Sequence, residues 1–173
     1  MHLNLAVLLS ITTALASPLT MGVNHAKPPT MKMVQMSGNE TIPMGHALVA
    51  NRCEIPLYLW SVGENISQQA IIESGQVYSE IFRRDPKTGG IAIKITTVKD
   101  GLYTSAPQTV FAYNLVNDLV WYDLSDVFGD PFQGEIVSLL PSEPTISWDD
   151  GVPPSGSQVR VQDARTDLVL TVC

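Results

Sequence analysis

The fold is organised around one apolar stretch, Ala47-Leu-Val-Ala-Asn-Arg-Cys-Glu-Ile-Pro-Leu-Tyr-Leu-Trp60. It is the first strongly apolar run beyond the N-terminal start. We expect it to form strand, interrupted near Pro56 because proline cannot donate a hydrogen bond to a sheet ladder. It also contains Cys53, one of only two cysteines, and the other, Cys173, is the last residue. A bond between them would tie the first strand of the domain to the last.

The composition suits one domain with a sizeable core and low surface charge. The chain has 173 residues, 45% hydrophobic and 16% charged, a charged fraction common in extracellular proteins. Its net charge of −7 argues against a nucleic-acid binder, which needs basic surface to release counterions from phosphates. The same balance disfavours a polybasic membrane contact. We therefore expect neither nucleic acid nor a membrane as a partner. We also expect the protein to be a monomer.

Residues 1–16 have the pattern of a secretory signal. An apolar core over residues 3–15 ends in the small-residue cleavage site Ala14-Leu-Ala16. An anchoring helix is the alternative, but the run is shorter than the ~20 residues that a bilayer requires. We expect the protein to be secreted.

Residues 17–46 are rich in proline and poor in core material, and they lack helical or strand periodicity. They predict an extended or disordered segment before a folded domain over residues 47–173. Two sequons, Asn39-Glu-Thr41 and Asn65-Ile-Ser67, predict glycosylation at Asn39 and Asn65.

Secretion would place the two cysteines in an oxidising compartment. In an oxidising compartment two cysteines most often form one disulfide. A loop of this length would stabilise the fold by about 4–5 kcal/mol in the chain-entropy model. Two unpaired thiols, or a bond between chains, are the alternatives. Because the sequence has no cluster of cysteine and histidine, we expect no metal site. It also lacks a phosphate loop and a dinucleotide fingerprint, and we expect no cofactor.

The folded part predicts many short strands. Ile91-Ala-Ile-Lys-Ile95 alternates between apolar and smaller or polar residues, as a half-buried strand does. Residues 108–115 and 119–123 flank the tight turn Asn117-Asp118 and resemble a hairpin. Residues 141–157 are rich in proline and are expected to be loop. Further strands are expected over residues 47–62, 76–82, 135–140, 158–161 and 168–172. This pattern indicates an all-β fold, a sandwich or a barrel.

Several segments resemble those of thaumatin-like proteins. Val49-Ala-Asn-Arg-Cys53 is similar to the family's opening strand, and Lys87-Thr-Gly-Gly-Ile91 to its second region. Trp121-Tyr-Asp-Leu-Ser125, with Gly129 after it, resembles a Tyr-Asp-Val-Ser segment of the family.

The closer resemblance is to a smaller fungal branch, the yeast-phase-specific secreted proteins first named from Blastomyces. These share the run from Asn51 to Gly63, and the segment Trp121-Tyr-Asp-Leu-Ser125 followed by Gly129-Asp-Pro-Phe132. The resemblance covers about residues 47–173. It implies an antiparallel β-sandwich and a bridge from Cys53 to Cys173.

The resemblance also implies where a site would lie. Larger thaumatin-like members are linked to β-glucan binding, weak endo-β-glucanase activity and antifungal action, through an acidic cleft. Asp123 falls on one cleft aspartate, Phe128 on the second, Ala112 near the glutamate position and Lys94 near the arginine position. Only one carboxylate is retained, whereas acid/base cleavage of a glycosidic bond requires two.

The candidate catalytic residues are Asp123, Asp126 and Asp130. The alternative is that these acids brace turns, where aspartate is common. Lys94 is expected to pair with Asp123 across the polar face of the sheet.

The candidate ligand-binding residues combine these polar groups with aromatic side chains. Tyr122, Phe128 and Trp148 are expected at the surface, where aromatic faces would stack on sugars. Trp60 and Trp121 are expected in the core. The ligand-binding set is therefore Lys94, Tyr122, Asp123, Phe128 and Trp148.

Three functional hypotheses follow. The first is a non-catalytic protein at the fungal cell wall or host surface, with β-glucan as its candidate ligand. The second is a weak endo-β-glucanase that uses Asp123 and a neighbouring acid, and the third is a structural or antigenic wall protein without a ligand. A catalytic triad is not expected, because residues 47–173 contain no histidine.

Overall fold

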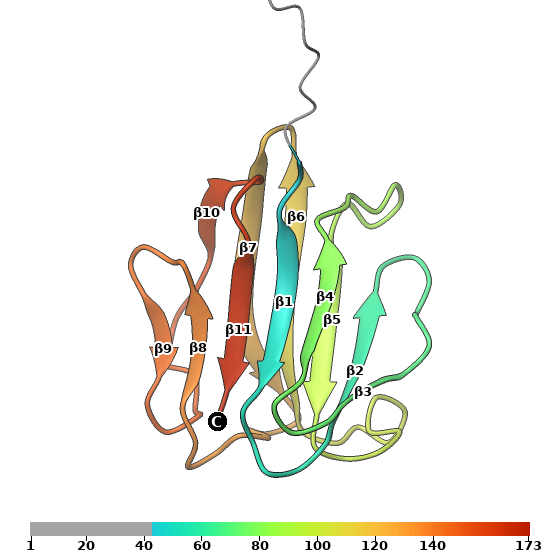
Figure 1. Ribbon diagram of the computed structural model, residues 1–173, viewed down its shortest axis with the longest axis vertical. Coiled ribbons are helices and arrows are strands. Elements are labelled where there is room, and N and C mark those ends of the chain that lie inside the picture. The colour runs from blue at the N-terminus through green and yellow to red at the C-terminus, as the bar shows by residue number, and fades with distance from the viewer. Residues whose placement is uncertain (1–42) are drawn as a thin grey trace, which may run out of the picture. The chain divides into compact units, whose positions relative to one another are not determined.

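The computed structural model describes residues 43–173, which fold into two β-sheets packed face to face (Figure 1). Within that range the secondary structure is all strand, and no helix could cross a membrane. The predicted signal, most of the predicted N-terminal segment and the sequon at Asn39 lie outside the described residues. The β-sandwich expected from the sequence is confirmed.

The first sheet has five strands in the order β4-β1-β11-β8-β9. Its strands are β1 (His46–Asn51), β4 (Val77–Ile81), β8 (Val137–Leu140), β9 (Ile146–Trp148) and β11 (Leu168–Val172). β1 and β11 pair in parallel, with Ala47 opposite Leu168, and the other pairs are antiparallel. The first and last strands of the domain therefore lie side by side within one sheet.

The second sheet has six strands, all antiparallel, in the order β10-β7-β6-β5-β2-β3. Its strands are β2 (Leu57–Val62), β3 (Ala70–Ile72), β5 (Ile91–Thr96), β6 (Gln108–Val116), β7 (Leu119–Val127) and β10 (Arg160–Asp163). The predicted hairpin is β6–β7, and Asn117 in its turn has φ of 55°, a left-handed conformation that asparagine tolerates.

The core lies between the two sheets. Ile91, Ile93 and Ile95 all point into it and are at most 2% exposed, which confirms the alternation predicted for β5. Other fully buried members of this core come from both sheets and include Val49, Leu59, Phe111, Leu124, Leu139 and Leu170.

Trp60 is buried, but it lies outside the core between the two sheets. It lies opposite Lys94 on β5, and so on the outer face of the six-stranded sheet. The loop after β5 covers it, with the Tyr103 ring edge-on at 6.1 Å between centroids. Its predicted burial is confirmed, at 1% exposure, but a loop rather than the opposite sheet provides the cover.

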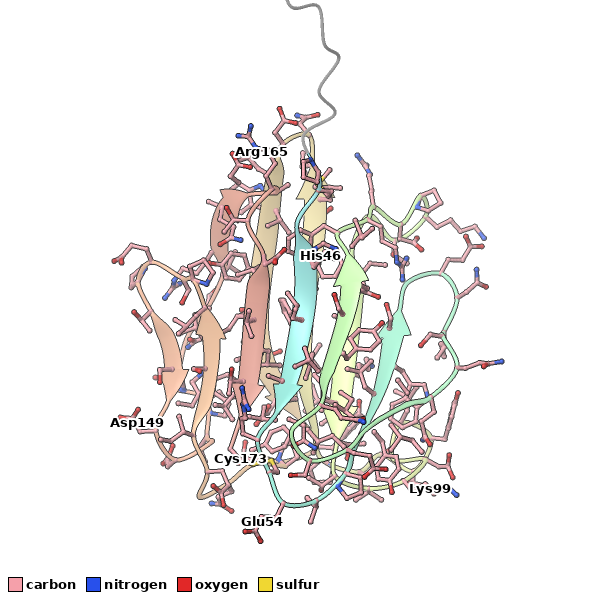
Figure 2. All side chains as sticks on the ribbon, in the orientation of Figure 1. His46, Glu54, Lys99, Asp149, Arg165 and Cys173 are labelled. Carbon is pink, nitrogen blue, oxygen red and sulfur yellow. A yellow bond between two sulfur atoms is a disulfide. The ribbon has the colours of Figure 1, made fainter. Side chains whose placement is uncertain are left out.

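A disulfide joins Cys53 to Cys173, with 4.9 Å between their α-carbons. It connects the residues that follow β1 to the end of β11, at the end of the sandwich where Figure 2 labels Cys173 and Glu54. The expected intrachain bridge is confirmed, and it closes a sequence separation of 120 residues.

Candidate functional site

A shallow groove of about 520 Å³ lies on the outer face of the six-stranded sheet. Its floor is one row of side chains that crosses β2, β5, β6 and β7 in register. Val62 pairs with Ala92, Ala92 with Ala112, and Ala112 with Asp123. Three steps between neighbouring strands, at ~4.8 Å each, give this row a length of about 14 Å. Because two central positions are alanine, the floor is low and flat.

The ends of the groove differ in character. At the β7 end Trp121 is 46% exposed, and Val159, just before β10, continues the lining. At the β2 end the lining is formed by Gly63, Thr88 and Gly90. A Cβ at position 90 would lie 2.9 Å from the Tyr113 carbonyl oxygen, so only glycine lets this loop approach the sheet so closely.

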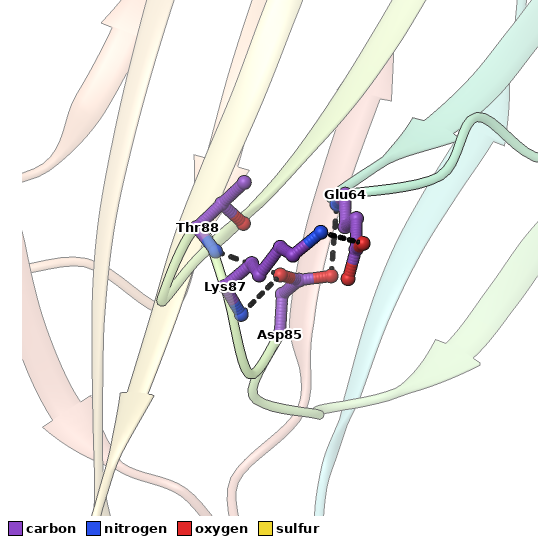
Figure 3. A network of polar contacts seen from close by, with 4 residues as sticks. All are labelled: Glu64, Asp85, Lys87 and Thr88. Carbon is purple, nitrogen blue, oxygen red and sulfur yellow. Dashed lines mark hydrogen bonds and ion pairs between the residues drawn. The ribbon is translucent and has the colours of Figure 1, made fainter.

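A carboxylate fixes the loops at the β2 end. Asp85 accepts hydrogen bonds from the backbone N–H groups of Glu64, Lys87 and Thr88, at 2.8 to 2.9 Å (Figure 3). These bonds, chiefly those from Thr88 and Glu64, hold the pKa of Asp85 well below its usual value. Lys87 also forms an ion pair with Glu64. The loop after β4 is thereby held against the loop after β2, which places Thr88 at the groove.

Asp123 is the one carboxylate that lines the groove. Partial burial raises its pKa above the usual aspartate value, against the lowering effect of backbone N–H groups and of Arg160. The expected pair with Lys94 does not occur among the ion pairs of residues 43–173. Lys94 shares the outer face but pairs with Val110, one row away from Asp123.

The structure does not bring Asp123 and Asp126 together. The two residues are three positions apart on β7, so their side chains point to opposite faces of the sheet. Asp126 Oδ1 accepts a hydrogen bond of 2.6 Å from Thr109 Oγ1. Burial, with the nearby Asp130 charge, raises the pKa of Asp126 to about 7. Asp126 and Asp130 therefore form a second acidic group, separate from the groove.

Two of the expected sugar-stacking residues are not at the surface. Tyr122 is 3% exposed and Trp148 is 2% exposed, so the expectation for both is wrong. Tyr122 points between the sheets and donates a hydrogen bond to the Pro141 carbonyl at 3.2 Å. Trp148 belongs to β9, a strand inside the tract that was expected to be loop.

The exposed aromatic residues within 43–173 are Tyr103, Trp121 and Phe128, and of these three Trp121 lines the groove. Trp121 was expected in the core, and the structure places it on the outer face instead. Phe128 is 64% exposed, but it follows β7 with φ of 63° and does not line the groove.

Asn65, in the second predicted sequon, is exposed in the turn after β2. Its carbonyl accepts a 3.0 Å hydrogen bond from the backbone N–H of Gly63, which lines the groove. Across residues 43–173, no three acidic, histidine or cysteine side chains are grouped as a metal site would require.

The chain matches the model of the Blastomyces yeast-phase-specific protein family over residues 36–173. The antigenic thaumatin-like protein of Arthroderma benhamiae is 34% identical to it over 113 residues, which cover 63% of this chain and 56% of that protein. The secreted thaumatin-like protein calA of Emericella nidulans is 34% identical over 83 residues, covering 48% and 46%. The chain thus spans about half the length of these curated relatives.

The fold is shared by a solved structure, that of a protein elicitor. The protein elicitor MoHrip2 from Magnaporthe oryzae superposes with a TM-score of 0.61 at 22% identity, covering 75% of this chain and 98% of that one. The thaumatin-like xylanase inhibitor gives a TM-score of 0.49 at 10% identity, covering 73% and 98%. Because the family model extends over all the described strands, the chain belongs to the Blastomyces yeast-phase-specific protein family, with thaumatin-like fungal proteins as its relatives.

Proposed function

We propose that this protein is secreted and binds a linear polysaccharide of the cell wall in the outer-face groove, without cleaving it. β-Glucan is the first candidate ligand, by the resemblance to thaumatin-like proteins. Extracellular location is supported by the disulfide and by the relative named as a secreted protein. The cell wall or host surface is the proposed place of action.

The pairing of Ala112 with Asp123 across the strands is the observation that supports a non-catalytic role. Glycoside hydrolysis requires two carboxyl groups, roughly 5 to 9.5 Å apart according to mechanism. The residue directly across the strand from Asp123 has no carboxyl group, and Asp126 faces the interior. The groove can therefore hold a sugar chain but offers one carboxylate to it.

The shape and chemistry of the groove suit a chain of pyranose rings. The flat floor of Ala92 and Ala112 leaves room for rings that lie across the strands. The indole of Trp121 offers an apolar face at one end, and such faces suit amphipathic ligands. Asp123, Asn114 and Thr88 supply hydrogen-bonding groups for hydroxyls.

A pull-down on insoluble β-glucan and chitin, run beside a reducing-sugar assay, tests this proposal. We expect retention of the wild-type protein with no sugar released. Trp121→Ala should weaken retention about tenfold, as expected when about 1.4 kcal/mol of stacking is lost. Phe128→Ala, which removes an exposed aromatic outside the groove, is the matched control and should bind normally.

Two results would contradict the proposal in different ways. Sugar release that disappears in Asp123→Asn would establish the weak endo-β-glucanase instead. No retention on either polymer would favour a structural or antigenic wall protein without a glycan ligand.

A further inference from the structure

The β7 end of the groove places an indole beside a carboxylate. Trp121 and Asp123 are separated by one residue on β7, so both side chains are on the outer face and their α-carbons are roughly 7 Å apart. Both line the groove, and Trp121 is 46% exposed.

No positive charge of the described chain is paired with this carboxylate. The ion pairs of residues 43–173 join His46 to Asp167, Lys87 to Glu64 and Arg165 to Asp163. Two further cations lie near enough to be considered. Lys94 extends from β5 one row away, where it pairs with Val110. Arg160 on β10 donates its hydrogen bonds to the Pro144 and Val159 carbonyls, at 2.9 and 3.0 Å.

The ionised form of Asp123 is therefore incompletely stabilised by its surroundings. Partial burial raises the pKa of this carboxyl, and the charge of Arg160 opposes that rise only in part. A cationic group entering the groove would stabilise the carboxylate, and tryptophan is the aromatic side chain that attracts cations best.

We propose that Trp121 and Asp123 form a subsite for a protonated amino sugar, so that the groove prefers partially deacetylated chitin to neutral glucan. This inference rests on the proposed function, because it names the polymer that the same groove selects. The ammonium group would contact the Asp123 carboxylate and the Trp121 face, while the sugar ring lies on the alanine floor. A neutral glucan would retain only stacking and hydroxyl hydrogen bonds.

The net charge of −7 requires a control, because an acidic protein attracts any polycation. Glu54 lies at the end of the sandwich that bears the disulfide, away from the groove lining (Figure 2). Glu54→Gln and Asp123→Asn each replace one carboxylate by a neutral amide. The two variants therefore differ in the position of the lost charge, at the end of the sandwich or in the groove.

The test is calorimetric titration with three tetrasaccharides, of glucosamine, of N-acetylglucosamine and of β-1,3-linked glucose, at moderate salt. We expect the glucosamine tetramer to bind at least tenfold more tightly than the other two. Asp123→Asn should abolish that difference, because it lowers affinity for the glucosamine tetramer at least tenfold more than affinity for the neutral sugars, whose hydroxyls an asparagine still hydrogen-bonds. Glu54→Gln should preserve the preference. Independently, the glucosamine tetramer should lower the pKa of Asp123 in an NMR titration of the wild-type protein, and the neutral tetramers should not.

Several outcomes would overturn the inference. Equal binding of charged and neutral tetramers would reject the subsite and leave the proposed function intact. An equal loss of preference in Glu54→Gln would mean general charge attraction, and tetralysine binding as tightly as the glucosamine tetramer would mean an amine site without sugar recognition. Binding of none of the three sugars would reject the proposed function itself.

Discussion

Asp126 is held in an environment that favours its protonated form. Its Oδ1 accepts the hydroxyl hydrogen of Thr109, while its Oδ2 is buried without a partner. A proton on Oδ2 would lessen the cost of burying this carboxyl and reduce its repulsion with Asp130. The pKa of Asp126 is about 7 in the folded protein, against 3.8 for the unperturbed group.

This shift predicts how stability varies with pH. Between about pH 4 and pH 7 the folded chain retains a proton on Asp126 that the unfolded chain has lost, so its free energy of unfolding should fall as pH rises. Because Asp126 is only half-buried, solvent screens part of the effect, and we expect a fall of about 1–2 kcal/mol. Urea denaturation of Asp126→Asn should show a flatter profile across this range. Asp149→Asn, at an exposed acid, is the control, and an unchanged slope in Asp126→Asn would contradict this assignment.

Ala112 offers a direct test of the cross-strand geometry in the groove. A glutamate there would bring a second carboxylate opposite Asp123, where paired β-carbons are about 5 Å apart. Ala112→Glu should raise the pKa of Asp123 further, because two neighbouring carboxylates resist ionising together. NMR titration of the Asp123 carboxyl carbon measures this. A pKa unchanged from the wild-type value would mean that the two side chains do not face each other.

At the scale of secondary-structure elements, one carboxylate joins the two sheets near β4. Glu80 on β4 accepts hydrogen bonds from Tyr78 at 2.9 Å and from Tyr113 on β6 at 2.6 Å. Burial, together with Glu80, raises the pKa of both tyrosines, so both hydroxyls remain donors. Beside them, Arg83 donates to the Ser61 hydroxyl on β2 at 2.9 Å. The edge strand β4 is thus fastened to the opposite sheet.

Removing that carboxylate should weaken the fold measurably. Glu80→Ala leaves two partly or fully buried hydroxyl groups without their acceptor, which should lower the free energy of unfolding by about 2–3 kcal/mol. Urea denaturation gives the value, with the exposed neighbour Ser79→Ala as the control. A loss below about 0.5 kcal/mol, as for an ordinary surface change, would show that the contact is unimportant.

The elements that the sequence predicts well are those with long, unmixed patterns. The isoleucines of β5 alternate without interruption, and Asn117 marks the β6–β7 turn. β9 has only three residues and lies in a proline-rich tract, so its pattern is too short to indicate a strand. Its buried Trp148 was therefore assigned to the surface.

The main error in predicting the site was the assignment of the β7 side chains to the two faces of the sheet. Trp121 and Tyr122 are adjacent on β7, so their side chains point to opposite faces of the sheet. Both are large aromatic residues, and either of them could fill an apolar core. The deciding signal was available, because Asp123 shares a face with Trp121, whereas Val120 and Leu124 share one with Tyr122. Reading the acid as solvent-facing would have placed Trp121 in the groove.

At the scale of the whole domain, the disulfide and the parallel pairing of β1 with β11 bring the two ends of the fold together. Replacing both cysteines, Cys53→Ser with Cys173→Ser, frees a loop of 120 residues in the unfolded chain. We expect the free energy of unfolding to fall by about 4–5 kcal/mol. Guanidinium denaturation of the variant and the wild type measures the change, and coincident midpoints would mean that strand pairing alone closes the domain.

The location of glycan binding is the most direct test of the central claim, that the outer-face groove holds the polymer. A ¹⁵N-labelled sample titrated with chitin and β-glucan oligosaccharides reports this residue by residue. The account predicts amide shifts at Ala92, Ala112 and Trp121 and few changes on the five-stranded sheet. Shifts concentrated instead at the second hollow, of about 400 Å³, lined by Arg52 and Glu135 beside the disulfide, would contradict it.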